Sequence, residues 1–404
     1  MDLTRRLAQL DALLKAPRVA GAEVAPVSAL QERALCERLG LSAAATPVGE
    51  VWTRDGILDD VPAPGGEDLP ALAQVMAPMG AALEETVLVP ETLLFVDTET
   101  TGLAGGTGTL VFLVGCAWWE AGVLRSRQYF LPGPGRETPL LAALGEQAAR
   151  FAAVVTYNGA RFDLPLLRTR ALLARRPDPC AGLASWDLLR ISRRLWGRRL
   201  PDCRQSTVEA QICGRARDPD DLPGALAPQA WLRWVRAGDG GALAQVLTHN
   251  QRDLTGMALI LTRAVAGAAR LTAAPTGPLE AWQDAWSAGR LCEGRRETAA
   301  AAAWIASALQ ALPNPALAPE AFFSDAVRLL KRAAAWPQAL RVLELAACAL
   351  GDRPWIHREA AILLEHRLMR LDQAWIHARR LGEPRRLARL DRKRAAEIGR
   401  EHTI

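Results

Sequence analysis

Lysine is nearly absent from this chain of 404 residues. Only Lys15, Lys331 and Lys393 occur among 49 basic residues, so the other 46 are arginines. Arginine binds phosphate through a planar fork of donors, which suits nucleic acid, although genomic codon bias is the simpler explanation of such a ratio. The formal net charge is only +5, and net charge alone does not define a function.

Cysteine is also sparse. The seven cysteines are odd in number, are scattered along the chain and form no C-x-x-C pair. This spacing argues against a disulfide framework and a zinc site, and it favours a reducing compartment. No apolar h-region follows the N-terminus, and the longest apolar runs, such as 109–119, are too short to cross a bilayer. We therefore expect a soluble, cytoplasmic protein that does not act on a membrane.

Composition and periodicity divide the chain into three parts. Residues 1–90 predict a partly irregular lead-in, because residues 40–90 are rich in Pro, Gly and acidic side chains and show little periodicity. Residues 91–268 read as three strands followed by alternating helices and strands, which predicts an α/β domain whose mixed sheet is flanked by helices. Residues 279–404 have helical spacing, and Trp336-Pro-Gln-Ala-Leu recurs loosely as Leu371-Asp-Gln-Ala-Trp. That offset of 35 residues suggests paired helices of the tetratricopeptide type.

Two carboxylates end the first strand of the α/β part, in Leu93-Leu-Phe-Val-Asp-Thr-Glu-Thr. Asp97 and Glu99 are two residues apart, so on a strand they project from the same face. Paired carboxylates repel each other unless a cation lies between them, and hard oxygen ligands suit Mg²⁺ or Mn²⁺. The pattern favours a metal site for phosphate chemistry; the alternative is that Asp97 merely ends a strand.

Two further carboxylates extend this pattern. Asp163 follows Thr156-Tyr-Asn-Gly-Ala-Arg-Phe where a strand passes into a helix, and Asp253 lies within a long predicted helix. His249 precedes Asp253 by four residues, so both share one helix face and the histidine could act as a general base. Alternatives remain for each residue: Asp163 could only cap its helix, Asp253 could face solvent, and His249 could be a surface histidine.

Taken together, these segments resemble the DEDD exonucleases of the ribonuclease H-like superfamily and, more closely, the YprB-type ribonuclease H-like domain. The resemblance covers roughly residues 92–265. The segments that carry it are Leu94-Phe-Val-Asp-Thr-Glu-Thr-Thr-Gly, Thr156-Tyr-Asn-Gly-Ala-Arg-Phe-Asp-Leu-Pro, Trp186-Asp-Leu-Leu, Val208-Glu-Ala-Gln-Ile-Cys-Gly, Asp221-Leu-Pro-Gly and His249-Asn-Gln-Arg-Asp. The resemblance implies a mixed five-stranded sheet and a C-terminal tetratricopeptide-like region.

The same resemblance implies two Mg²⁺ or Mn²⁺ ions. Asp97 would bridge them, Glu99 and Asp253 would complete one site, and Asp163 would hold the second ion. The implied reaction is hydrolysis of phosphodiester bonds from the 3′ end. The familiar subclasses place Tyr four residues, or His five residues, before the last Asp, whereas His249 here has the tyrosine spacing. Neighbouring residues expected to contact the substrate are Thr98, Thr100, Asn158 and Phe162.

The expected partner is nucleic acid, with single-stranded DNA ahead of RNA. Ten arginines against three acids at 161–200, and nine basic against three acidic residues at 376–400, suggest a groove that follows a phosphate backbone. The alternative for both stretches is solvated helix faces. Two other functions remain open: a structure-selective endonuclease or RNA-trimming ribonuclease on the same fold, and a non-catalytic nucleic-acid-binding scaffold whose C-terminal helices recruit a protein partner.

Overall fold

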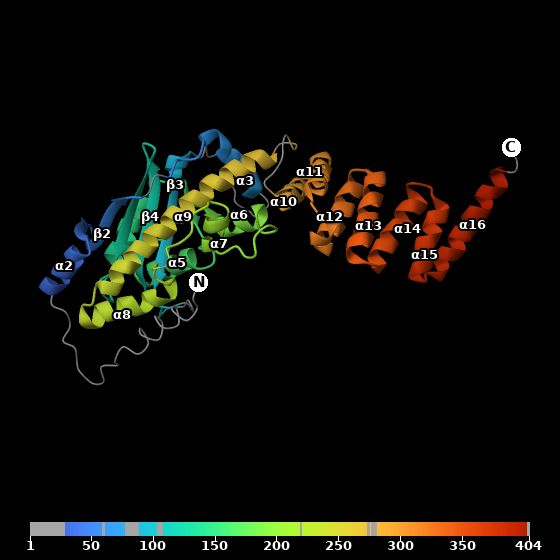
Figure 1. The fold of residues 1–404 in the computed structure, drawn as a ribbon. Helices are drawn as coiled ribbons and strands as arrows, with labels where there is room; N and C mark the ends of the chain where they lie inside the picture. The colour runs from blue at the N-terminus through green and yellow to red at the C-terminus, as the bar shows by residue number, and fades with distance from the viewer. Residues whose placement is uncertain are drawn as a thin grey trace, which may run out of the picture.

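A computed structural model of the chain shows an α/β body from which a row of helices extends (Figure 1). The structure describes residues 29–58, 61–76, 89–102, 108–218, 220–272, 275 and 281–401.

The body is built on one mixed sheet with the strand order β1-β2-β5-β4-β3-β6-β7. The central strands are β3 (Leu93–Thr100), β4 (Val111–Glu120) and β5 (Val123–Phe130), which pair antiparallel in sequence order. β6 (Ala153–Thr156) and β7 (Ala184–Asp187) continue the sheet parallel to β3. The predicted mixed sheet flanked by helices is confirmed.

The predicted number of five strands is wrong, because β1 (Ser42–Thr46) and β2 (Gly49–Ile57) add a hairpin at one edge. β2 pairs antiparallel with β5 from Trp52 to Ile57, so part of the expected lead-in belongs to the sheet. β1 (Ser-Ala-Ala-Ala-Thr) shows no apolar–polar alternation, and four of its five residues, the Ser and the Ala residues, are poor strand formers. It is a strand because it pairs with β2, which in turn pairs with β5, and a local pattern does not reveal such pairing.

Helices cover both faces of the sheet, and some of them precede its strands in the chain. They are α2 (Ala29–Arg38), α3 (Leu69–Met76), α4 (Glu137–Ala148), α5 (Asp163–Leu173), α6 (Leu188–Leu195), α7 (Gln205–Gln211), α8 (Ala227–Ala237) and α9 (Gly241–Thr272), with the short 3₁₀ turns η1 (Gly66–Asp68), η3 (Pro90–Thr92) and η4 (Gly224–Leu226).

The longest of these helices, α9, runs through the protein core. Its apolar side chains Leu254, Met257 and Leu261 repeat at helical spacing and are fully buried. By length and composition alone, Gly241–Leu271 is the one described helix that could cross a membrane, but 61% of the window tested lies buried inside the protein. The helix is therefore accounted for as a core element, and it carries two of the predicted site residues.

Beyond the body lies what we call the helical arm, residues 281–401 (Figure 1). It contains α10 (Trp282–Gly294), α11 (Thr298–Ala311), η5 (Pro315–Leu317), α12 (Glu320–Arg332), α13 (Trp336–Leu350), α14 (Pro354–His366), α15 (Leu371–Leu381) and α16 (Pro384–Glu401). The two related segments begin α13 and α15, so the repeat seen in the sequence marks equivalent helix starts. The helical region is confirmed, and its tetratricopeptide character stays a prediction.

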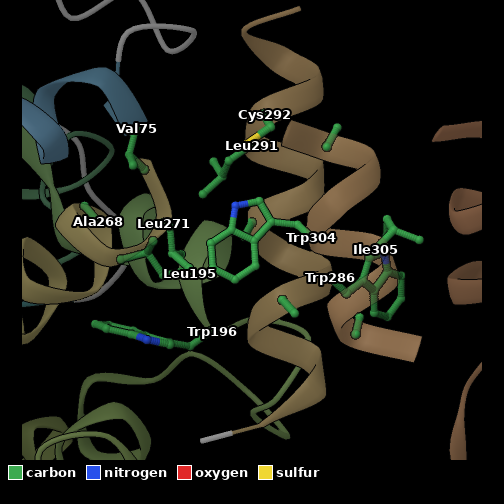
Figure 2. Packing of buried hydrophobic residues seen from close by; sticks show 14 of the residues in the cluster. Val75, Leu195, Trp196, Ala268, Leu271, Trp286, Leu291, Cys292, Trp304 and Ile305 are labelled. Atoms are coloured by element: carbon green, nitrogen blue, oxygen red, sulfur yellow. The ribbon is translucent and has the colours of Figure 1, made fainter. Parts of the chain in front are cut away.

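The arm and the body share one hydrophobic core. Figure 2 shows Trp304 of α11 directed toward Leu195 of α6 and Leu271 of α9, with Leu291 beside it. Arg198 stacks over the Trp286 ring at 4.7 Å, and Arg199 Nη1 lies 3.2 Å from Asp284 Oδ2. Continuous apolar packing with polar contacts around it holds α10 and α11 against the body.

Replacing Trp304 tests this junction. Trp304→Ala removes a side chain that is 1% exposed, so we expect a loss of about 3–5 kcal/mol in the free energy of unfolding. Denaturant unfolding followed by circular dichroism measures it. The control is Leu317→Ala in the same arm, at a side chain that is 64% exposed, where the change should stay within about 0.5 kcal/mol. Equal effects of the two changes would contradict a shared core.

Candidate metal centre

β3 delivers the first two acidic residues. Asp97 pairs with Gly115 and Glu99 with Leu113 of β4, and the register shifts at a bulge between Glu99 and Thr100. Glu99 is buried and Asp97 half-buried, so the strand carries both carboxylates into the protein rather than into open solvent. Their common face is the one that α9 crosses, because Asn250 of that helix contacts Asp97.

α9 brings the next two residues together. His249 and Asp253 are one helical turn apart, and His249 Nε2 lies 3.3 Å from Asp253 Oδ2. His249 is buried, with an exposed fraction of 7%, and the Asp253 side chain is 16% exposed, so neither residue is simply a solvated part of a helix face.

Asp163 begins α5 but does not cap it. The N-cap position is Phe162, and no side-chain hydrogen bond caps this helix. The Asp163 carboxylate instead accepts a hydrogen bond from Thr98 Oγ1 of β3. This contact ties the start of α5 to the strand that carries Asp97 and Glu99, and it sets aside helix capping as the role of Asp163.

Burial and neighbouring negative charges raise the pKa values of Asp97, Glu99 and Asp163. Removal from bulk water is the largest cause for Asp97, whose pKa lies well above its usual range, and the charges of Asp253, Glu99 and Asp163 add to it. The pKa of Glu99 is raised well above its usual range first by burial and then by Asp253, Asp163 and Asp221. Burial also raises the pKa of Asp163. This mutual destabilisation of charge is what a cation relieves.

Asn250 fixes the orientation of Asp97. Its Nδ2 donates to Asp97 Oδ2 at 2.8 Å, while its Oδ1 accepts from Gln128 Nε2 at 2.8 Å. Gln128 also donates to the carbonyl of Leu247 at 2.8 Å, and both amide side chains are fully buried. A Cβ at Gly115 would overlap with the Asn250 amide, so glycine is required there for close approach.

Asp221 lies on the other side of His249. Asp221 Oδ2 is 3.1 Å from His249 Nδ1, and Arg252 Nη1 donates to Asp221 Oδ1 at 2.8 Å. A histidine held through Nδ1 presents Nε2 in a fixed direction, here toward Asp253. Sequence reasoning gave Asp221 no role, although it stands in one of the segments that carry the resemblance.

Arg217 enters the acidic cluster from the loop after α7. Its Nη2 lies 3.0 Å from Glu209 Oε1 and also contacts Asp253 Oδ1. These carboxylates raise the pKa of Arg217 against the opposing effect of burial. In the part of the chain that the structure describes, no three His, Cys, Asp or Glu side chains form a ready-made metal site. Thr98 contacts an oxygen of Asp163 and Arg217 contacts an oxygen of Asp253, and a bound cation would need these oxygens as its ligands.

The chemistry of the donor set nevertheless fits a hard divalent cation. Four carboxylates converge from β3, α5 and α9, and the pKa values of Asp97 and Glu99 are strongly raised, first by burial and then by the neighbouring negative charges. Oxygen ligands of this kind suit Mg²⁺ or Mn²⁺. Binding a cation would require Asp253 to exchange its contact with Arg217 and Asp163 its contact with Thr98.

The four expected substrate contacts lie around this cluster. Phe162, beside Asp163, is 57% exposed, which is unusual for a large apolar side chain and leaves a ring face open. Asn158 has a positive φ of 65°, and its N–H donates to Asp187 Oδ1 at 2.8 Å. The hydroxyls of Thr98 and Thr100 are engaged within the protein, by Asp163 and by the carbonyl of Gly102.

Several arginines of the basic stretch at 161–200 make structural contacts rather than line a groove. Arg170 Nε donates to Glu137 Oε1 at 2.6 Å, and Arg194 Nη1 donates to the carbonyl of Val75 at 2.6 Å. Arg198 and Arg199 join the body to α10. These four arginines therefore make contacts that support the fold. The expectation that they line a groove for a phosphate backbone does not hold for them.

Enlarging Gly115 tests the placement of Asp97. Gly115→Ala should displace Asn250 and lower Mn²⁺ affinity about 10–100-fold, the usual cost of losing a residue that orients a ligand. Titration calorimetry with MnCl₂ measures it. The matched control is Gly133→Ala, where an added Cβ meets no atom within 4 Å and affinity should stay as in the unchanged protein. Unaltered Mn²⁺ binding by a folded Gly115→Ala variant would contradict this role of Asn250.

Comparison with known proteins shows which superfamily this domain resembles. Residues 94–265 match the RNase_H superfamily, a range that starts within β3 and ends within α9. Over 163 residues the chain is 37% identical to "Uncharacterized protein YprB" of Bacillus subtilis (strain 168). That similarity covers 40% of this chain and 39% of the Bacillus protein. The strands and helices that bring the carboxylates together thus form a ribonuclease H-like domain, which this chain carries at residues 94–265.

Proposed function

We propose that this protein is a metal-dependent 3′→5′ exonuclease that hydrolyses phosphodiester bonds, with single-stranded DNA as its substrate. The observation that carries the proposal is the convergence of Asp97, Glu99, Asp163 and Asp253 in a ribonuclease H-like domain. We assign catalysis to residues 91–268. The lead-in at 1–90, whose β1 and β2 extend the sheet, and the helical domain at 279–404 lie outside this assignment.

In this proposal Asp97, Glu99, Asp163 and Asp253 hold two Mg²⁺ or Mn²⁺ ions. Bound ions would lower the pKa of water and neutralise charge on the phosphate. The protein's own contribution is positioning: Asn250 orients Asp97, and Thr98 ties α5 to β3. Phosphate hydrolysis needs little covalent help from the protein, so fixed charges and alignment carry most of the catalysis.

His249 is the proposed general base. Its Nδ1 lies against Asp221, which leaves Nε2 facing the carboxylate cluster to accept a proton from the attacking water. The spacing of four residues before Asp253 supports this role, because one helical turn places Nε2 3.3 Å from Asp253 Oδ2. Phe162 is proposed to stack against the base of the terminal nucleotide, since its exposed ring lies next to Asp163.

The first test removes the paired carboxylates. Asp97→Asn with Glu99→Gln keeps side-chain size but removes two negative charges, so cleavage of 3′- and 5′-labelled single strands in Mn²⁺ should vanish. EDTA should have the same effect on the unchanged protein. Robust cleavage by the double variant would overturn the proposal.

The products of the unchanged protein separate the alternatives. Release of mononucleotides from linear DNA supports the exonuclease, whereas cleavage of circular strands would identify an endonuclease. Cleavage of RNA alone would identify an RNA-trimming ribonuclease. Binding of nucleic acid with neither cleavage nor uptake of Mn²⁺ would favour the scaffold and contradict the proposal.

The second test separates the base from the metal ligands. His249→Gln should lower kcat about 100-fold or more, because proton transfer is lost, while Mn²⁺ binding stays within a few fold. Asp221→Asn should lower kcat less, since it only loosens the ring. The control is Gln245→Ala, an exposed position on the same helix, which should leave kcat unchanged. A kcat for His249→Gln equal to that of the control would exclude His249 as the base.

A further inference from the structure

A second concave site lies in the helical arm, away from the carboxylates. It is a cavity of about 750 Å³ between α12, α13 and α14. The residues that define its chemistry are Arg328, Lys331, Arg332, Trp336, Trp355 and Arg367. Cationic side chains and two indoles therefore line the same cavity. Glu359 is the single acidic residue of the lining among the residues described.

One wall of the cavity is a stacked pair. The Arg367 guanidinium lies over the Trp336 ring, 4.9 Å from the ring centroid. Arg367 is exposed and, within the described chain, forms no ion pair, so its donors remain available. A guanidinium flat on an aromatic ring offers a planar surface for stacking together with hydrogen-bond donors for an anion.

A second indole lines the cavity. Trp355 of α14 is half-buried, and its Nε1 is itself buried, with no hydrogen-bond partner among the described residues. What Trp355 adds to the lining is therefore an aromatic ring, a surface on which a flat ligand can stack.

The cations of α12 have acidic partners: Arg328 contacts Glu293 and Asp325, and Lys331 contacts Glu359. Burial lowers the pKa of Arg328, and the neighbouring cations Arg290 and Arg332 lower it further. Arg332 Nη1 lies 2.6 Å from Glu293 Oε1 and its side chain stays 59% exposed. On the larger scale, residues 281–401 carry a net charge of +6, whereas the rest of the chain sums to −1. The chain's whole positive excess therefore lies in the arm.

We propose that this cavity binds single-stranded polynucleotide, with bases stacked against Trp336 and Trp355 and phosphates held by Arg332 and Arg367. The proposal rests on the proposed function, because it assigns a second contact to the same substrate. Stacking platforms beside cations are the usual means of holding single strands without regard to sequence. Since the arm shares a core with the body, a strand held here stays at a fixed place relative to the carboxylates.

An acidic peptide is the competing occupant, because it too would bring negatively charged oxygens to the arginines of the cavity. The pair of flat surfaces favours nucleic acid, since carboxylate side chains do not stack.

Binding of a fluorescein-labelled oligothymidylate to the full chain, measured by fluorescence anisotropy in EDTA, tests the proposal. Arg332→Glu with Arg367→Glu should weaken binding tenfold or more and lower the salt slope by about 1.4, or ~0.7 per phosphate contact. The matched control is Arg341→Glu with Arg370→Glu, which changes charge equally at exposed arginines outside the cavity. Trp336→Leu should weaken binding about fivefold or more without a change in salt slope.

The outcomes separate this inference from the proposed function. Equal binding by the cavity variant and its control would overturn the inference, even if the unchanged protein cleaves DNA in Mn²⁺. Weakened binding by the cavity variant alone would support the inference, even if cleavage is never observed. A polyglutamate peptide that binds the unchanged protein but not the cavity variant, while oligothymidylate binds both, would overturn it in favour of an acidic-peptide site.

Discussion

The mutual repulsion of carboxylates at the end of β3 is the constraint on which the site depends. Burial raises the pKa values of Asp97 and Glu99 well above their usual range, neighbouring carboxylates raise them further, and the fold holds the groups there nonetheless. Asn250 and Thr98 fix two of them by hydrogen bonds, and Arg217 contacts a third. Under the proposed function, a divalent cation would relieve this repulsion at the place where the sheet, α5 and α9 bring the carboxylates together.

Arginine serves two purposes in this chain. Some guanidinium groups build the molecule: Arg170 binds Glu137 in the body, and Arg198 stacks on Trp286 where the arm joins it. Others, such as Arg332 and Arg367, stay exposed around the cavity of the arm. The excess of positive charge belongs to the arm, while the body provides acidic ligands. Under the two proposals, the arm would bind the phosphates of a nucleic acid and the carboxylates of the body would act on it through bound cations.

Local patterns predict most of the body. β3, the helix 241–272 and the arm follow from periodicity, because each buries a face whose spacing is visible in the sequence. The hairpin of β1 and β2 does not, since its strands depend on pairing with β5. Likewise the roles of Asn250 and Asp221 depend on the rotation of α9 over the sheet. Asn250 and Asp97 are 153 positions apart in the sequence, and His249 and Asp221 are 28 positions apart, so their contacts leave no local pattern.

The most direct measurement is a crystal structure of the protein soaked in MnCl₂, with anomalous scattering recorded at the manganese edge. The account predicts two anomalous peaks among Asp97, Glu99, Asp163 and Asp253, with Arg217 withdrawn from Asp253. Density that leaves Arg217 on Asp253, with no anomalous peak at the carboxylates, would contradict it.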